Sequence, residues 1–231
     1  MVQFYSIYHF IIIFIFLILP FFFKKINLKF LILLLLILEF VRVLRCLNDF
    51  DISKDLSLQL CFIYPFIGVL YLIFKNKLFK DYLGVFGIFF GGLAIIFNDP
   101  NYIFSYDVLH LYIYHSLMMI ISLNILNEKI TASFIPLFGI LLLQFIFTFI
   151  CNLVIGFGAN YMFLNTFLLP FNKNLYNINI DFLTFKINGF CFLDMFYILF
   201  DMFGAFYYVL LFIFFYFSFY LMYKLVFRIK N

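Results

Sequence analysis

Two side chains that often work together in nucleophilic catalysis, a thiol and an imidazole, lie on separate apolar segments of this chain. Cys61 is near the start of segment 56–74, and His115 is about a third of the way along segment 108–126. A thiol becomes a strong nucleophile when a neighbouring base takes its proton, and histidine is the usual base. An imidazole inside hydrocarbon is also costly unless it has a partner or a task. The two residues are therefore a candidate nucleophile and base, provided that their segments touch.

Other polar side chains inside the apolar segments also need protein partners. Glu39 and Arg42 are three residues apart on one helix face, where an ion pair makes both tolerable in a membrane. Alternatively, Arg42 or Arg45 holds an anionic lipid head group near the outer surface. A polar stripe at four-residue spacing, which must face protein or a cavity, consists of Gln144, Thr148 and Asn152.

Seven apolar segments are long enough to cross a bilayer as α-helices. They are residues 5–23, 28–47, 56–74, 81–97, 108–126, 133–156 and 205–227. We therefore expect an all-α, polytopic transmembrane helix bundle that forms a single integral membrane domain over residues 1–231. The other helices are expected to form a cage around segment 108–126. An Asn-rich polar loop insertion is expected at 165–188.

Two features of these segments predict local packing. Pro65 lacks an amide hydrogen, so the Cys61 carbonyl one turn earlier needs a hydrogen-bond donor from elsewhere. Small residues on one helix face let backbones approach closely. On segment 81–97 such a face would be formed by Gly84, Gly87, Gly91 and Gly92.

The distribution of basic residues predicts the orientation. Seven spans in this order put 10 of the 15 Lys and Arg residues on one side of the membrane. The positive-inside rule makes that side cytoplasmic, so the amino terminus is expected outside and the carboxyl terminus inside, in the cell membrane. Cys61 then lies roughly 8 Å and His115 roughly 12 Å below the outer surface. That is the depth of lipid ester bonds.

The two candidate residues also have non-catalytic interpretations. Cys61 is alternatively a small apolar packing residue, or it forms a disulfide with Cys46, because all four cysteines fall towards the outer side, where disulfides are permitted. His115 is alternatively an internal latch that hydrogen bonds to one of three side chains: Tyr112, Gln144 or Asn152. His110, five residues before His115, is expected to point elsewhere on the helix.

Composition excludes several classes of function. The residues AVILMFWYC make up 68% of the chain and charged residues 11%, which is far from the balance of a soluble domain. The 42 Phe residues are interpreted as a bias at lipid-facing positions. No basic face outside the spans indicates a nucleic-acid partner. Two poorly aligned histidines and one cysteine are too few for a metal site, and no cofactor motif is present. The expected partners are membrane lipids, and the oligomeric state is left open.

Five short motifs occur in the order of a known family. They are LSLQLC at 56–61, NDP at 98–100, LYIYHS at 111–116, NYMFL at 160–164 and MFGAFYY at 202–208. In this order, and in the roughly fifty-residue gap between cysteine and histidine, the chain resembles the YwaF-like family of bacterial integral membrane proteins. A eukaryotic relative of that family is understood as a cysteine-dependent phospholipid acyltransferase.

The resemblance implies that Cys61 is the nucleophile and His115 the catalytic histidine. Three positions depart from the family pattern, and the final tryptophans are also missing. Gln59 stands in place of a histidine, Ser57 in place of a proline and Ser116 in place of a glycine. If the missing histidine takes part in proton transfer, this member is weak or inactive.

Three functional hypotheses follow. The first is a membrane-embedded lipid acyl-transfer enzyme, a transacylase or acyl hydrolase, in which Gln59 or Asn160 donates to the developing oxyanion. Asn160 and Tyr161 are both expected at the outer end of segment 133–156. The second is a non-catalytic transporter or lipid-binding protein whose site combines Glu39 and Arg42 with the polar stripe that includes Asn152. The third is a degenerate family member with a scaffolding role.

Overall fold

A computed structural model describes residues 7–23, 25–47, 60–97, 105–127, 130–155 and 207–230. All secondary structure in these ranges is helical, as expected for an all-α membrane protein. The helices are α1 (Ile7–Phe22), α2 (Leu28–Cys46), α3 (Leu60–Phe74), α4 (Lys77–Phe97), α5 (Tyr106–Leu126), α6 (Phe134–Ile155) and α8 (Tyr207–Lys230). One described helix corresponds to each predicted span. The expected loop at 165–188 and residues 56–59 lie outside the described residues.

The clearest difference from the predicted boundaries is the start of α4. This helix begins at Lys77, whereas the sequence predicted its start at Asp81. Lysines near a helix end keep their ammonium groups in water while their stems cover apolar surface, so a basic first turn is compatible with a membrane helix. The segment interpreted as a basic loop is therefore partly the first turn of α4.

Local backbone chemistry sets several helix ends. The side-chain oxygen of Asn27 accepts hydrogen bonds from two amides in the first turn of α2, and Ser105 caps α5 in the same way. After α3, Lys75 has a φ of 52° and its amide donates to the Tyr71 carbonyl over 2.8 Å. The Asn76 side chain then accepts from an amide at the start of α4 over 2.8 Å. The α3–α4 connection is consequently very short.

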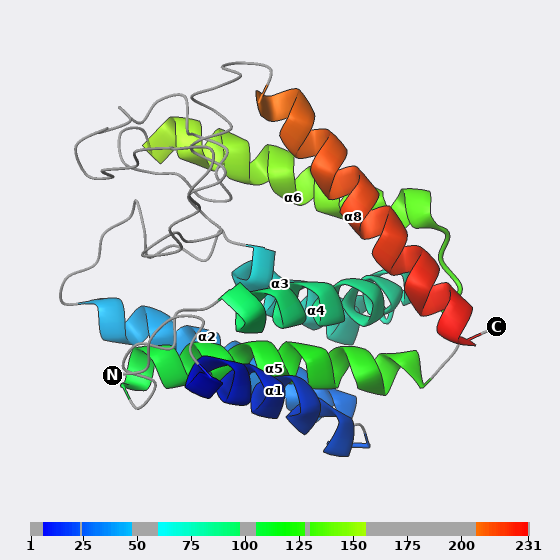
Figure 1. Cartoon of the computed structure of the whole chain (residues 1–231). Coiled ribbons are helices and arrows are strands. Elements are labelled where there is room, and N and C mark those ends of the chain that lie inside the picture. Colours follow the sequence, from blue (N-terminus) through cyan, green and yellow to red (C-terminus); the bar gives the residue numbers. More distant parts are fainter. Residues whose placement is uncertain are drawn as a thin grey trace, which may run out of the picture.

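Helix α5 lies in the lower layer of Figure 1, next to α1 and α2 and below α4. Each residue from Tyr114 to Ser122 is buried, so protein surrounds the whole circumference of this part of the helix. Its neighbours include α1, α2 and α4, and α3 packs between α2 and α4. The Ser116 hydroxyl on α5 also donates to the Phe16 carbonyl on α1 over 3.1 Å. The expected cage is therefore formed by α1, α2 and α4, whereas α6 and α8 pack against α4 instead of α5.

Small residues allow α4 to approach α5 closely. A Cβ atom added at Gly84 would lie 2.6 Å from Ile125, and one at Gly91 would lie 2.6 Å from the His115 carbonyl oxygen. A Cβ at Gly87 would overlap the Ser122 hydroxyl. The predicted packing face is thus confirmed for three of the four glycines. Gly92 differs, because a Cβ there would meet no atom within 4 Å.

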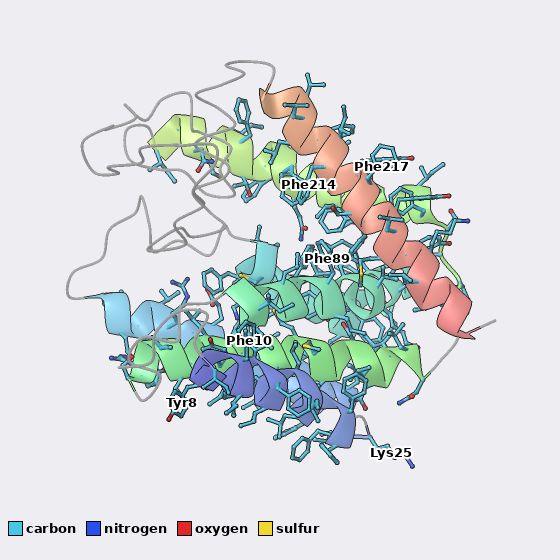
Figure 2. The ribbon with its side chains drawn as sticks, viewed as in Figure 1. Tyr8, Phe10, Lys25, Phe89, Phe214 and Phe217 are labelled. Carbon is cyan, nitrogen blue, oxygen red and sulfur yellow. The ribbon has the colours of Figure 1, made fainter. Side chains whose placement is uncertain are left out.

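Helices α6 and α8 lie on the other side of α4 from α5 (Figure 1). Phe219 of α8 is fully buried and its ring packs against those of Phe86, Phe89 and Phe90 on α4. Figure 2 shows Phe89 in the region between α4 and α8. The interpretation that the Phe residues face lipid therefore holds for only some of them.

Three of the described helices are long and apolar enough to cross a membrane by length and composition. They are Lys77–Ile96, Val108–Leu126 and Phe134–Asn152. Large apolar side chains are also exposed around the bundle, for example Leu143 and Val154 on α6 and Tyr8 on α1 (Figure 2). Such a surface is suited to lipid and far exceeds the apolar patches of soluble monomers. The seven-span arrangement and its orientation stay predictions.

Candidate functional site

Cys61 is the second residue of α3 and is half-buried. Its thiol is free, as is that of Cys151 on α6. The predicted alternative of a Cys46–Cys61 disulfide is therefore wrong. A free thiol at this position remains available for chemistry.

The carbonyl of Cys61 has the partner that the sequence required. Pro65 is inside α3 and cannot donate to it. Instead, the hydroxyl of Tyr114 on α5 donates to the Cys61 carbonyl oxygen over 3.0 Å. The prediction that this carbonyl needs a donor from elsewhere is confirmed, and the donor comes from the helix that carries His115.

Tyr114 is also the centre of a group of rings. It is fully buried, and its ring centroid is 5.7 Å from that of Phe62, 5.9 Å from that of His110 and 5.6 Å from that of His115. Tyr114 was not singled out from the sequence, although a phenol beside a buried histidine was a usable signal. His110 was expected to point elsewhere, yet it stacks on the same tyrosine ring.

His115 is buried near the middle of α5. Neither ring nitrogen forms a hydrogen bond with the described residues. The latch interpretation is therefore wrong, because His115 bonds to none of the three expected partners, Tyr112, Gln144 and Asn152. The side-chain oxygen of Gln144 accepts instead from Tyr82 over 2.5 Å. The Cys61 thiol does not hydrogen bond to His115 in this structure either. Tyr114 contacts both residues, through a hydrogen bond to the Cys61 carbonyl and a ring contact with His115.

The predicted ion pair lies beside Cys61. Arg42 Nη2 is 2.8 Å from Glu39 Oε1, and Arg42 Nε is 3.1 Å from Glu39 Oε2. The Arg42 guanidinium also lies 4.1 Å above the ring of Phe62. The prediction of an i,i+3 pair is confirmed, and the pair borders the candidate nucleophile.

The remaining predicted site residues are distributed differently. Gln59, Asn160 and Tyr161 lie outside the described residues. Asn152 is fully buried on α6, together with the other members of the predicted polar stripe, so the expectation that the stripe faces protein is confirmed. Helix α6 packs mainly against α4 and α8, whereas Cys61 and His115 lie on α3 and α5.

Further buried polar contacts in the bundle were not anticipated. The hydroxyls of Tyr64 on α3 and Ser122 on α5 both donate to the Leu83 carbonyl of α4, over 2.8 and 2.6 Å. Near the start of α4, the buried carboxylate of Asp81 accepts three hydrogen bonds from the segment before α6, given by the Thr131 amide, the Thr131 hydroxyl and the Ala132 amide. These hydrogen bonds join different helices, and the protein supplies both the donor and the acceptor of each one.

An all-helical bundle with paired polar groups inside and apolar side chains outside defines a multi-helix integral membrane protein. The chain belongs to the TMEM164 family, whose match covers residues 2–223. No curated protein and no solved structure matches the chain.

Proposed function

We propose that this membrane protein is a lipid acyl-transfer enzyme with Cys61 as nucleophile and His115 as base and acid. The Cys61 thiol gives its proton to His115, and its sulfur attacks the carbonyl carbon of a lipid acyl ester. The ester C–O bond breaks, a thioester forms, and His115 returns the proton to the leaving alcohol. An acceptor alcohol or water then attacks the thioester, loses its proton to His115, and restores the thiol.

One observation carries the proposal. Tyr114 contacts the His115 ring and the backbone of Cys61 at the same time, over a ring-centroid distance of 5.6 Å and a hydrogen bond of 3.0 Å. Tyr114 directly precedes the candidate base in α5, and its hydroxyl reaches the backbone of the candidate nucleophile on α3. Both nitrogens of the buried His115 ring lack hydrogen-bond partners among the described residues. A buried imidazole of this kind inside a membrane bundle is typical of a functional group. Resting sites are commonly looser than working ones, so an open Cys–His pair is compatible with this chemistry.

The family match supports a membrane protein, and the resemblance supports the acyl-transfer function. Membership of the TMEM164 family agrees with a membrane protein of this size. By its five motifs the chain also resembles the YwaF-like family, a eukaryotic relative of which is understood as a cysteine-dependent phospholipid acyltransferase. In that pattern the cysteine and histidine fall on Cys61 and His115. Gln59, in place of a histidine, predicts a slow enzyme.

The proposed topology determines the acyl donor. With the amino terminus outside, the starts of α3 and α5 face the extracytoplasmic side, where no acyl-CoA is available. The donor is then a membrane phospholipid, and the reaction is a lipid-to-lipid transacylation or an acyl hydrolysis. In the proposed site, the Glu39–Arg42 pair beside Cys61 would contact the polar region of the bound phospholipid.

A transporter is the main alternative, because buried polar residues extend from Glu39 at one end of the bundle to Asp81 at the other. A transport path, however, needs polar groups that are open to a passing solute. Asp81 accepts hydrogen bonds from the protein, as does the Leu83 carbonyl. The close contacts at Gly84 and Gly87 leave little room beside them. The hydrogen bonds of Asp81 and of the Leu83 carbonyl therefore indicate a structural role for these groups and not a transport path.

The test is acyl exchange between a labelled phospholipid and a lysophospholipid in proteoliposomes containing the purified chain. Cys61→Ala should abolish exchange, and His115→Ala should lower it by about 10²–10⁴-fold, the usual contribution of a general base. Cys151→Ala is the matched control, because it removes the other described free thiol from a different helix and should leave exchange unchanged. Unchanged exchange in Cys61→Ala would refute the proposal. Unchanged labelling of Cys61 by a thiol-reactive lipid in His115→Ala would count against the pair.

A further inference from the structure

One hydrogen bond in the candidate site replaces a backbone bond that α3 cannot form. A helical residue at position 65 would normally donate its amide to the Cys61 carbonyl, and Pro65 has no amide hydrogen. The Tyr114 hydroxyl takes this place from a helix 53 residues further along the chain. The bond therefore fastens the start of α3, where Cys61 lies, to the middle of α5.

The ring of the same tyrosine sits against the candidate base. Its centroid lies 5.6 Å from that of His115 at an interplanar angle of 82°, an edge contact, and 5.9 Å from that of His110 in a stacked arrangement. Edge-to-face and stacked rings at such distances attract each other and restrict rotation. Tyr114 thus contacts the backbone of the nucleophile with one end and the imidazole of the base with the other.

We propose that Tyr114 is a positioning residue that holds the Cys61 end of α3 at a fixed place relative to His115. The inference rests on the proposed function for its catalytic meaning, whereas the effect on the Cys61 backbone does not depend on it. Without the hydroxyl, the partly buried Cys61 carbonyl loses its donor, and an unpaired carbonyl in a membrane interior is unfavourable. The start of α3 then moves to find another partner.

A second tyrosine supplies a matched control. Tyr64 lies on α3 one turn beyond Cys61, is equally buried, and donates its hydroxyl to the Leu83 carbonyl over 2.8 Å. Removal of that hydroxyl leaves no carbonyl unpaired, because Ser122 still donates to the same oxygen. Tyr64→Phe therefore removes another tyrosine hydrogen bond of α3 and leaves the bond to the Cys61 carbonyl in place.

The test compares Tyr114→Phe and Tyr64→Phe in the full chain reconstituted in nanodiscs. The first measurement is the rate at which an apolar maleimide alkylates Cys61, with Cys151 read in the same sample by mass spectrometry as the internal reference. Tyr114→Phe should alkylate Cys61 about tenfold faster, because the half-buried thiol loses one fixed backbone contact. Tyr64→Phe and the Cys151 signal should stay at the wild-type rate.

The second measurement separates kcat from KM for acyl exchange. Tyr114→Phe should lower kcat by about tenfold and leave KM within about twofold, because a positioning defect acts on the chemical step. Adding Pro65→Ala to Tyr114→Phe gives the Cys61 carbonyl a helical amide donor again. The double variant should therefore return both the alkylation rate and kcat towards the wild-type values.

The outcomes distinguish this inference from the proposed function. An unchanged Cys61 alkylation rate in Tyr114→Phe, or no rescue by Pro65→Ala, would overturn the positioning role. A wild-type chain without acyl exchange that still shows the alkylation change and its rescue would reject the proposed enzyme and keep the role of Tyr114 in fixing α3.

Discussion

Gly91 provides the sharpest test of how α4 sets the position of His115. A Cβ atom at this position would lie 2.6 Å from the His115 carbonyl oxygen and 2.8 Å from Met119 Cγ. A Cβ atom in a protein essentially never lies within 3.0 Å of a non-bonded heavy atom. The two helices would therefore have to move apart by at least 0.4 Å, the difference between 3.0 and 2.6 Å. The atom in the way is backbone oxygen, which cannot rotate aside.

The neighbouring Gly92 isolates this clash. Both substitutions to alanine gain the same intrinsic helix propensity, up to about 1 kcal/mol. A Cβ at Gly92 meets nothing within 4 Å. The difference between Gly91→Ala and Gly92→Ala is therefore the overpacking penalty alone, about 1–3 kcal/mol. Gly92→Ala should be as stable as the wild type or slightly more stable, and Gly91→Ala should be the less stable of the two.

The assay is thermal unfolding of the two variants in the same detergent. For a chain of this size, each kcal/mol corresponds to about 2–4 °C in Tm, so Gly91→Ala should unfold at least about 2 °C below Gly92→Ala. The proposed acyl exchange should also fall in Gly91→Ala, because the shift occurs at His115, the proposed base. Equal Tm values for the two variants would refute the close α4–α5 contact at His115.

Three further predictions concern buried polar contacts. Glu39→Gln leaves the Arg42 charge without its carboxylate and should destabilise the fold by about 3 kcal/mol, whereas adding Arg42→Met should recover most of that loss; chemical denaturation of the single and double variants checks this. Asp81→Asn weakens three charge-assisted hydrogen bonds and should cost about 1–2 kcal/mol, with increased proteolysis between α5 and α6 as the readout; intact resistance to protease would contradict it. Ser122→Ala leaves the Leu83 carbonyl one donor, so its cost should be only about 0.5–1 kcal/mol in the same denaturation assay. A loss above about 3 kcal/mol would contradict that last expectation.

Sequence patterns anticipated the helices and several local contacts well. Apolar runs of bilayer length marked the described helices because a membrane span must satisfy all its backbone groups within the helix. The Glu39–Arg42 pair followed from i,i+3 spacing on one helix. The missing donor at the Cys61 carbonyl followed from the chemistry of Pro65. Each of these predictions needed information from one helix only.

Contacts between helices were much harder to predict. The donor to the Cys61 carbonyl is Tyr114, and its identity depends on the packing order of α3 and α5, which periodicity does not encode. The same holds for the partner of Tyr82, which is Gln144 on α6. Asp81 was predicted only as the first residue of the span 81–97. Its burial depends on amides 50 and 51 residues further along the chain.

The Leu83 carbonyl has a mechanical consequence for the whole protein. Three helices meet at this single oxygen, since α4 supplies the acceptor while Tyr64 of α3 and Ser122 of α5 supply the donors. Sliding any one of these three helices by one residue would break at least one of these bonds. The three helices are therefore expected to move together. Any opening that admits a lipid tail must then come from hinging of α1, α2 or the α6–α8 pair against this rigid trio.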